Sequence, residues 1–370
     1  MDNNFDYNGR LARLQDKIQA EEVDAVLITK VANVTYFSGF RGDSTALLID
    51  KKNYRQLITD GRYIEQAQRQ AKNFALVEQT EGLSKKLVDV IKNTGLKKIG
   101  IEGLTMTVAQ HSYLKKELAN VEFKSIELDT LRQVKDAAEI VQIRKACQIA
   151  DDAFKKILPV IKPNVREIDI AAELEYFMRQ LGSEKVAFTT IVASGWRSSL
   201  PHGEATDKKI QLGEFVTMDF GATWSGYRSD ITRTICVGKA SDEQRKMYNA
   251  VLDAQLYGLE IITAGKSGKD IDAAVRERLS NSGYGKYHTV NGDKDFFVHG
   301  LGHGVGLEIH EEPRLSKLSK CESLLPNMIV TDEPGAYLEN FGGVRIEDTV
   351  LVTSGKAQSL TISPKNLIEL

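Results

Sequence analysis

The chain has 370 residues, which is too long for one small core and predicts two domains. Hydrophobic residues make up 42% and charged residues 27%, which excludes a disordered chain, and the net charge of -2 gives no basic footprint for nucleic acid. Three distant cysteines without CxxC spacing, no leader-like N-terminal stretch and no run of about 18 apolar residues predict a cytoplasmic protein that does not enter a membrane.

The first third of the chain predicts helices and strands in turn. A helical pattern at residues 11–22 precedes the strand-like run DAVLIT, and the runs ALLID and QLITD flank a turn at KKN. Helical patterns follow at residues 62–72 and 84–93, then the strand KKIGIEG, a helix near residues 108–119 and the strand EFKSIEL. Short strands separated by helices are typical of a layered α/β domain. We place this domain, which we interpret as a scaffold, at residues 1–130.

Residues 131–370 predict a second domain of a different class. Asp136 and Glu139 have the spacing of a capping box, and apolar residues then recur at steps of three and four. Further helices are predicted to begin near Ile168 and at Ser241. The strand-like runs are FTTIVASG, EFVTMDFGA, YRSDITRTICV, NMIVTDE and GVRIEDTVLVT. Their alternation and their β-branched residues predict a largely antiparallel sheet, and therefore an α+β domain.

Two aspartates flank the small polar turn in MDFGATWSGYRSDITRT. If this turn is centred on Trp224 and Ser225, Asp219 and Asp230 lie directly opposite each other in a hairpin. Cross-strand neighbours have Cβ atoms about 4.5–5.5 Å apart, and two like charges at that distance destabilise the strand pair. A shared proton, a basic partner such as Arg228 or Arg233, or a bound cation would offset the repulsion.

More polar residues of this kind follow downstream. The run FVHGLGHGVGLEIHEEP carries three of the six histidines, and its alternating glycines predict a glycine-rich loop or a bent strand rather than a helix. Glu333 ends a strand before the turn signal Pro-Gly. In GGVRIEDTVLV, alternation places Arg345 and Glu347 on one face. Each of these residues alone is more often structural, but their combination indicates a site.

This combination resembles the aminopeptidase P and prolidase family of pita-bread metallopeptidases, which also includes methionine aminopeptidase and creatinase. The family binds metal through an Asp in DxG, an Asp in SDxTRT, a His in HGxGH, a Glu before Pro-Gly and a Glu in RxED. The matching residues here are Asp219, Asp230, His303, Glu333 and Glu347. The front part looks like the family's creatinase-like domain through NVTYFSGFRG and LITDGRYIEQA. The resemblance implies an α+β pita-bread catalytic domain at residues 131–370, preceded by a smaller creatinase-like α/β domain at residues 1–130.

The chemistry of these ligands agrees with that resemblance. Four carboxylates and one imidazole, with no thiolate, suit hard or borderline divalent ions better than structural zinc. We expect two divalent ions per subunit, Mn²⁺ first, with Co²⁺, Fe²⁺ or Zn²⁺ as alternatives. The resemblance implies that Asp230 and Glu347 bridge both ions, that Asp219 binds one, and that His303 and Glu333 bind the other. Such ions lower the pKa of bound water toward about 7, and Glu333 is expected to accept its proton.

Four further residues match family positions around the substrate. His202 matches a histidine that lines the substrate site, and His299 and His310 match histidines that bind substrate and stabilise the tetrahedral oxyanion. Arg345 matches an arginine close to the substrate or to the last metal ligand. Positioned donors lower the barrier most where charge develops on the reacting oxygen. Together with Glu333, these four residues form the expected catalytic set.

The resemblance implies hydrolysis of the Xaa-Pro peptide bond. The N-terminal domain favours an Xaa-Pro enzyme over methionine aminopeptidase, and the retained ligands argue against the metal-free creatinase. We favour an aminopeptidase P-like enzyme that releases the N-terminal residue from peptides with proline second. The alternatives are an Xaa-Pro dipeptidase and, outside the enzymes, a degenerate peptide-binding protein on the same fold. The expected partners are proline-containing peptides and a second copy in a homodimer, with no nucleic acid and no membrane.

Overall fold

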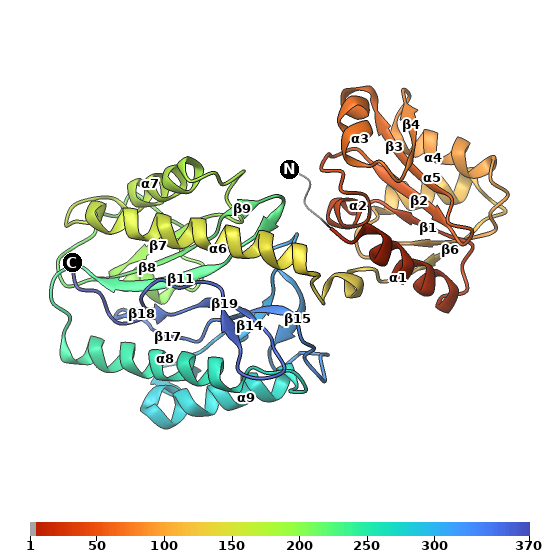
Figure 1. Ribbon diagram of the computed structural model, residues 1–370. Helices are drawn as coiled ribbons and strands as arrows, with labels where there is room; N and C mark the ends of the chain where they lie inside the picture. The colour runs from red at the N-terminus through yellow and green to blue at the C-terminus, as the bar shows by residue number, and fades with distance from the viewer. Residues whose placement is uncertain (1–4) are drawn as a thin grey trace. The chain divides into compact units, whose positions relative to one another are not determined.

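The computed structural model describes residues 5–370 (Figure 1). The chain divides into two compact units, one ending at Arg132 and the other running from Gln133 to Leu370. Residues 1–4, with which the predicted N-terminal domain begins, lie outside the described residues. Each unit has its own sheets and its own apolar core. Within residues 5–370, no helix combines the length and apolar character needed to cross a membrane.

The first unit is built on a six-stranded sheet. The helices of this unit are α1 (Tyr7–Ala20), α2 (Val31–Ser38), α3 (Ile64–Gln70), α4 (Leu83–Lys92) and α5 (Val108–Glu117). The strands are β1 (Ala25–Ile28), β2 (Ala46–Asp50), β3 (Arg55–Asp60), β4 (Ala75–Gln79), β5 (Lys98–Ile101) and β6 (Glu122–Ser125). They lie in the order β4-β3-β2-β1-β5-β6, with β2 antiparallel to both of its neighbours and the other pairs parallel.

The central strand β1 is buried along its whole length because both faces of the sheet are covered. Ala25 and Leu27 belong to the core that the sheet shares with α4 and α5, and the alternate residues Val26 and Ile28 are also fully buried. Helix α2 and strand β4 were not predicted. Helix α2 forms in a segment rich in β-branched and aromatic residues, which are typical of strands. It ends at Gly39, whose φ of 77° is easy for a glycine.

The second unit contains four helices and a series of short strands. The helices are α6 (Ala137–Ile157), α7 (Glu167–Gln180), α8 (Asp242–Ile261) and α9 (Gly268–Leu279). The strands are β7 (Ile191–Ser194), β8 (Phe215–Phe220), β9 (Thr223–Trp224), β10 (Tyr227–Arg228), β11 (Ile231–Cys236), β12 (Lys286–Thr289), β13 (Gly292–Asp295), β14 (Gly302–Gly304), β15 (Glu311–Leu315), β16 (Ile329–Asp332), β17 (Gly335–Leu338), β18 (Gly342–Arg345), β19 (Asp348–Leu351) and β20 (Gln358–Ser359). The predicted capping boxes at Asp136 and Ser241 are both present.

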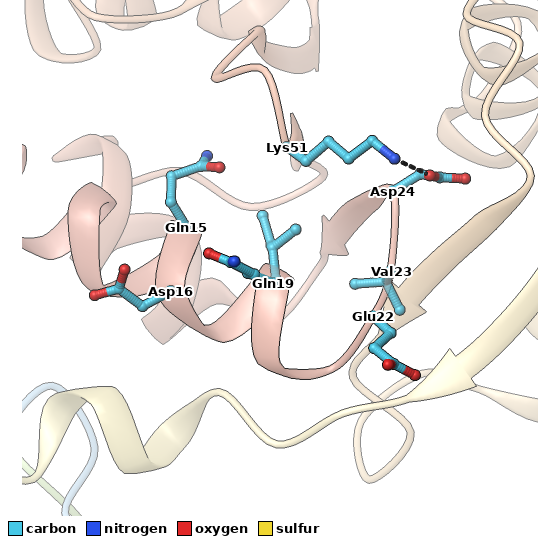
Figure 2. A pocket seen from close by; sticks show the side chains of 8 residues that line it. Gln15, Asp16, Gln19, Glu22, Val23, Asp24 and Lys51 are labelled. Atoms are coloured by element: carbon cyan, nitrogen blue, oxygen red, sulfur yellow. Dashed lines mark hydrogen bonds and ion pairs between the residues drawn. The ribbon is translucent and has the colours of Figure 1, made fainter.

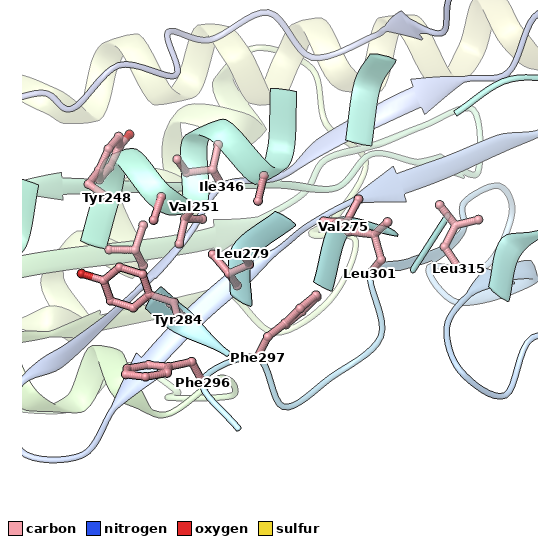
Figure 3. Close-up of a cluster of buried hydrophobic side chains, with 14 of the residues drawn as sticks. Tyr248, Val251, Val275, Leu279, Tyr284, Phe296, Phe297, Leu301, Leu315 and Ile346 are labelled. Carbon is pink, nitrogen blue, oxygen red and sulfur yellow. The ribbon is translucent and has the colours of Figure 1, made fainter. Parts of the chain in front are cut away.

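Helices cover the strands of the second unit from two sides (Figure 1). The two larger sheets have the orders β11-β8-β7 and β15-β14-β16-β19-β20, and their neighbouring strands run antiparallel, as predicted. Helices α6 and α7 share a core with β7, β8 and β11. Helices α8 and α9 share another with β16, β18 and β19, part of which is drawn in Figure 3. A bridge between Thr232 and Glu347 connects β11 to the segment between β18 and β19.

The predicted pairing of the two aspartates was wrong. Asp219 pairs with Thr232 rather than with Asp230, because the turn is centred on Ser225 and Gly226 instead of one residue earlier. The two turn residues have φ of 51° and 83°, the conformation of a two-residue hairpin turn that disfavours a bulky side chain such as the preceding tryptophan. A shift of two positions keeps each side chain on its face of the sheet, so the aspartates still point to the same side.

The run GVRIEDTVLVT is two strands rather than the single strand that was predicted. Strand β18 ends at Arg345 and pairs with β17, whereas β19 begins at Asp348 and pairs with β16. Between them, Glu347 N donates to Thr232 O at 3.1 Å, so the chain leaves one sheet for another at this point. The predicted alternation survives the break, since Arg345 Nε and Glu347 Oε2 both contact Thr232 Oγ1, at 3.0 and 2.5 Å.

Candidate metal centre and substrate-binding residues

The five predicted metal ligands come from neighbouring strands of the second unit. Strands β8 and β11 are paired, β16 lies between β14 and β19, and the bridge at Glu347 connects the two sheets. The ligands lie at the following places: Asp219 in β8, Asp230 directly before β11, His303 in β14, Glu333 directly after β16, and Glu347 between β18 and β19. Antiparallel pairing therefore brings together residues that are up to 128 positions apart in the sequence (347 − 219).

The side chains of these residues converge. Asp230, His303 and Glu347 offer ligand atoms that all lie within 4.8 Å of one another. His303 Nε2 lies 3.5 Å from Asp230 Oδ2 and 3.5 Å from Glu333 Oε1. Asp219 joins the cluster through its charge, which acts on Asp230, Glu333 and Glu347. All five side chains are at least 85% buried, so they face one another rather than bulk solvent.

Glycines allow His303 to enter this cluster. A Cβ on Gly302 would lie 2.0 Å from Thr331 O, so that position admits no side chain. The register of β14 shifts between Gly302 and Gly304, which is the predicted bent strand. His303 Nδ1 lies 3.1 Å from Gly304 O, so this nitrogen carries the proton and the Nε2 lone pair faces the carboxylates. Metal-binding histidines are commonly oriented by such a hydrogen bond.

The acids of this cluster are not fully neutralised by positively charged side chains of the protein. Burial first, and then the neighbouring carboxylates, raise the pKa of both Asp230 and Glu347 well above the usual range. Burial raises the pKa of Glu333 to about 8, and the charge of Asp219 contributes to that shift. Burial lowers the pKa of His303 to about 3, so its imidazole is neutral at physiological pH. A neutral imidazole is the form that binds a metal ion.

The residues present fit a divalent metal ion. The Oδ1 atoms of Asp219 and Asp230 are buried and accept no hydrogen bond within the described chain. Buried carboxylate oxygens without a partner are costly, and a cation supplies both the missing charge and the missing contact. The donor set of carboxylates and one imidazole is also the set that binds divalent ions in many enzymes.

Two of the predicted substrate-binding histidines border this cluster. His299 Nδ1 lies 3.8 Å from Glu333 Oε2, and its Nε2 lies 2.7 Å from Tyr337 Oη. Because His299 Nδ1 also contacts the carbonyl of the following residue at 2.8 Å, Nε2 accepts the hydrogen bond from Tyr337. The ring of His310 is exposed and lies 4.4 Å from the ring of His303 in an edge-on arrangement. His310 is therefore in contact both with a proposed metal ligand and with solvent.

Arg345 and His202 complete the predicted set. Arg345 is 3% exposed, and its Nη1 donates to Tyr337 Oη at 2.8 Å and to Pro201 O at 3.2 Å. This contact holds the segment that carries His202, whose exposed side chain lies close enough for its charge to act on His299. The structure therefore brings together all of the site residues that were named from the sequence.

Three polar residues at the site were not predicted. Thr232 Oγ1 donates to Glu347, and Thr331 Oγ1 donates to Glu333 Oε1 at 3.1 Å. Both threonines lie two positions from a predicted ligand, so strand periodicity could have identified them. Tyr337 reaches the site from β17, and burial raises its pKa to about 12, so the phenol keeps its proton. No spacing in the sequence relates Tyr337 to the ligands.

A pocket lies on the first unit, beside α1 (Figure 2). Its lining includes Asp16, Glu22 and Asp24, and its lysine, Lys51, is paired with Asp24 at 2.7 Å. The lining has no histidine or cysteine, and its acids are partly in solvent. The lining of this pocket therefore lacks the buried carboxylates and the imidazole of the candidate metal centre, and we assign the pocket no role.

Comparison with known proteins places the chain among peptidases. The model of Metallopeptidase family M24 matches residues 141–354, and that of the Creatinase/Prolidase N-terminal domain matches residues 10–134. The Xaa-Pro dipeptidase of Pyrococcus furiosus is 40% identical over 365 residues, covering 97% of this chain and 99% of the relative. A solved structure of the Xaa-Pro dipeptidase from Bacillus anthracis is 42% identical, with a TM-score of 0.93 and coverage of 99% and 100%. That of the X-Pro aminopeptidase from Thermotoga maritima is 38% identical, with a TM-score of 0.86 and coverage of 97% and 99%.

The chain belongs to metallopeptidase family M24. The matches confirm the predicted fold, a pita-bread domain preceded by a creatinase-like domain, and the predicted class of enzyme, a metallopeptidase. Membership of the family implies divalent metal ions, in agreement with the donor set at the candidate metal centre.

Proposed function

We propose that the protein hydrolyses the Xaa-Pro peptide bond at a centre of two divalent ions, Mn²⁺ first. The proposed ligands are Asp219, Asp230, His303, Glu333 and Glu347. The observation that carries the proposal is the convergence of Asp230, His303 and Glu347, whose ligand atoms lie within 4.8 Å of one another. Bound at this place, the ions supply a water molecule of lowered pKa and polarise the carbonyl of the substrate.

Glu333 is the proposed proton carrier. Its carboxylate lies beside His303 and His299, where the attacking water and the scissile bond would meet. In the reaction, the water oxygen bonds to the carbonyl carbon and one proton moves to Glu333. The same proton then moves to the proline nitrogen as the carbon–nitrogen bond breaks. A carboxylate within reach of the attacking water and of the leaving nitrogen can accept a proton from the first and return it to the second.

The remaining residues bind and orient the substrate. We propose that His202 lines the substrate site and that His310 donates to the oxyanion, roles that the exposure of both side chains to solvent supports. His299 is bonded to Tyr337, whose hydroxyl also accepts from Arg345 at 2.8 Å. We assign to these residues the role of orienting the reacting carbonyl of the substrate. Proline leaves the scissile nitrogen without an N–H, so the site needs no acceptor for one.

The length of the substrate separates two forms of this function. The sequence favoured an aminopeptidase, but the relatives at 40% and 42% identity are Xaa-Pro dipeptidases, so we propose the dipeptidase first. The X-Pro aminopeptidase at 38% identity keeps the second form in consideration. Turnover of an Xaa-Pro dipeptide and of the matching Xaa-Pro-Xaa tripeptide, followed by mass spectrometry, separates them. Cleavage of the tripeptide at an equal or higher rate would favour the aminopeptidase.

Metal analysis joined to a chelation assay tests the function itself. The purified chain is expected to bind two divalent ions, to lose Xaa-Pro hydrolysis with EDTA, and to recover it with Mn²⁺. A degenerate peptide-binding protein would hold less than one ion per chain and show no chelator-sensitive hydrolysis. A metal-free hydrolase like creatinase would be indifferent to the chelator. Either of these results would exclude the proposal.

Two features of the molecule's organisation belong to the same proposal. We propose that residues 1–130 and 131–370 are separate domains. The two compact units support this division, because their boundary in the sequence lies between Arg132 and Gln133. We also propose a homodimer, on the family resemblance alone. Light scattering coupled to gel filtration measures the mass in solution, and a particle of about 41 kDa rather than twice that value would exclude the dimer.

A further inference from the structure

Two aspartates lie directly behind two of the proposed metal ligands. Asp332 and Asp348 are opposite each other in the antiparallel pair of β16 and β19, and both are fully buried. Glu333 follows the first of these aspartates and Glu347 precedes the second. The side chains of Glu347 and Asp348 have different partners, since Glu347 accepts from Thr232 Oγ1 whereas Asp348 accepts from Arg233 and Thr361. Because each glutamate is the chain neighbour of one of these aspartates, the position of the aspartate pair determines the backbone position of both glutamates.

Asp348 is held by four donors. Arg233 Nη2 donates to it at 2.8 Å, Thr361 Oγ1 at 2.9 Å and Gln255 Nε2 at 3.2 Å, and the fourth donor is Lys365 Nζ. Lys365 also acts electrostatically on Asp332 across the strand pair. Lys365 and Thr361 both belong to the C-terminal segment, residues 361–365, which lies in no helix or strand of its own.

The same segment is fixed from two further sides. Asp151 of α6 accepts from the backbone nitrogens of Ile362 and Ser363, at 2.9 and 2.7 Å, and from Ser363 Oγ at 2.5 Å. Arg233 of β11 donates to Ser363 O at 2.8 Å and also to Glu347 O at 2.6 Å. One buried guanidinium thus connects the C-terminal segment to the backbone of a proposed metal ligand.

We propose that Lys365, with the C-terminal segment at residues 361–365, is a positioning residue for the metal centre. The inference rests on the proposed function, because it takes Glu333 and Glu347 as metal ligands. Without Lys365, the buried carboxylate of Asp348 keeps Arg233 as its one ion-pair partner, and a buried charge that is less well compensated disturbs the strand pair from which both glutamates project. Replacement of residues that orient metal ligands typically costs about 10–100-fold in metal affinity.

The test compares Lys365→Met and Lys365→Arg in the full-length chain. The dissociation constant for Co²⁺ is measured by competition with a chelator, and the visible absorption of bound Co²⁺ reports the geometry of its ligands. We expect Lys365→Met to weaken Co²⁺ binding about 10–100-fold and to alter the spectrum, whereas Lys365→Arg stays within about threefold of the wild type because the charge is kept. A folded Lys365→Met chain with wild-type affinity and spectrum would overturn the inference.

A control variant removes an ion pair made four residues after Lys365, outside the segment at residues 361–365. Arg245 Nη2 of α8 contacts Glu369 Oε1 at 2.5 Å, and both side chains are partly exposed. Arg245→Ala loosens the C-terminal residues without touching the aspartate pair, and we expect unchanged Co²⁺ affinity. Weakening of equal size in Arg245→Ala and Lys365→Met would refute a specific role for Lys365.

If Lys365→Met does not fold, Thr361→Val decides instead, because it removes one hydroxyl bonded to Asp348 and preserves volume. We expect it to weaken Co²⁺ binding severalfold, and wild-type affinity would overturn the inference. If the wild-type chain itself binds no divalent ion, the proposed function fails. If it binds two ions and the variants do not differ from it, only the positioning role fails.

Discussion

Arg345 Nη2 donates to Asp219 Oδ2 at 2.7 Å, while Asp219 Oδ1 accepts no hydrogen bond from the described chain. One oxygen of this carboxylate is thus neutralised by a buried arginine, and the other remains for a cation. Arg345 also bonds to Tyr337 and Thr232, so a single guanidinium connects a proposed metal ligand to the groups around the substrate.

Replacement of Arg345 should therefore reduce catalysis strongly. We expect Arg345→Ala to lower kcat/KM for an Xaa-Pro dipeptide by about 10²-fold or more, and Arg345→Lys to recover little, because an ammonium cannot reproduce the fork of bonds. Steady-state kinetics measure both values. Arg278→Ala, at a half-exposed ion pair with Asp253, is the control and should leave kcat/KM unchanged. Near-normal activity of Arg345→Lys would contradict this account.

The buried acids should make stability without metal depend on pH. Because the folded pKa of Glu333 is raised from 4.5 to about 8, its contribution to the free energy of unfolding is fully present below about pH 4.5. That contribution is lost as the pH rises through about 8. Urea unfolding of the EDTA-treated chain between pH 5 and pH 8 measures this loss, and Glu333→Gln, which cannot titrate, should show less of it. Equal pH dependence in the two chains would be evidence against the assignment.

Metal binding should release protons for the same reason. Glu333, Asp230 and Glu347 all have a raised pKa, so they bind protons at neutral pH that a metal ion must displace. The neutral His303 should release none. Calorimetric titration with Mn²⁺ in buffers of different ionisation enthalpy counts the protons. A heat that does not depend on the buffer would show that these acids are already ionised.

Asp230→Asn should abolish hydrolysis but make the metal-free chain more stable. The change removes an acid whose ionised form is disfavoured by burial and by three neighbouring carboxylates, so that folding without metal costs free energy to protonate it, and it also removes a proposed metal ligand. We expect the EDTA-treated variant to be more stable than the EDTA-treated wild type by roughly 1–3 kcal/mol, with bound metal reduced and hydrolysis lost. Thermal unfolding and elemental analysis measure the two effects. A lower melting temperature without metal would contradict the proposed repulsion.

Gly304 should tolerate no side chain. A Cβ there would lie 2.5 Å from Glu312 O, a backbone atom that cannot move without disturbing β15. We expect Gly304→Ala to cost about 3 kcal/mol or more of stability and to displace His303, with loss of bound metal. Gly355→Ala is the control, because nothing lies within 4 Å of its Cβ position. Similar melting temperatures for the two variants would show that the bend at β14 is not constrained.

Local signals in the sequence predicted local structure well. The capping boxes at Asp136 and Ser241 involve groups three residues apart, and both form with the expected bonds. The bend at His303 was visible in the alternating glycines, since close backbone approach excludes a Cβ. Helix α2 was missed because its residues favour strands, and tertiary packing overrode that preference.

The sequence by itself determined the division into an α/β and an α+β part, because short periodic patterns carry that information, and its motifs indicated the family and the candidate metal ligands through their resemblance to known proteins. Only the tertiary structure decided that Asp219 pairs with Thr232, that a strand breaks after Arg345, and that Tyr337 reaches His299. The physical reason is that each of these depends on a turn conformation or on strand pairing between distant segments. The free energy of pairing two distant strands depends on how the whole domain packs, and not on the residues that are neighbours in the sequence.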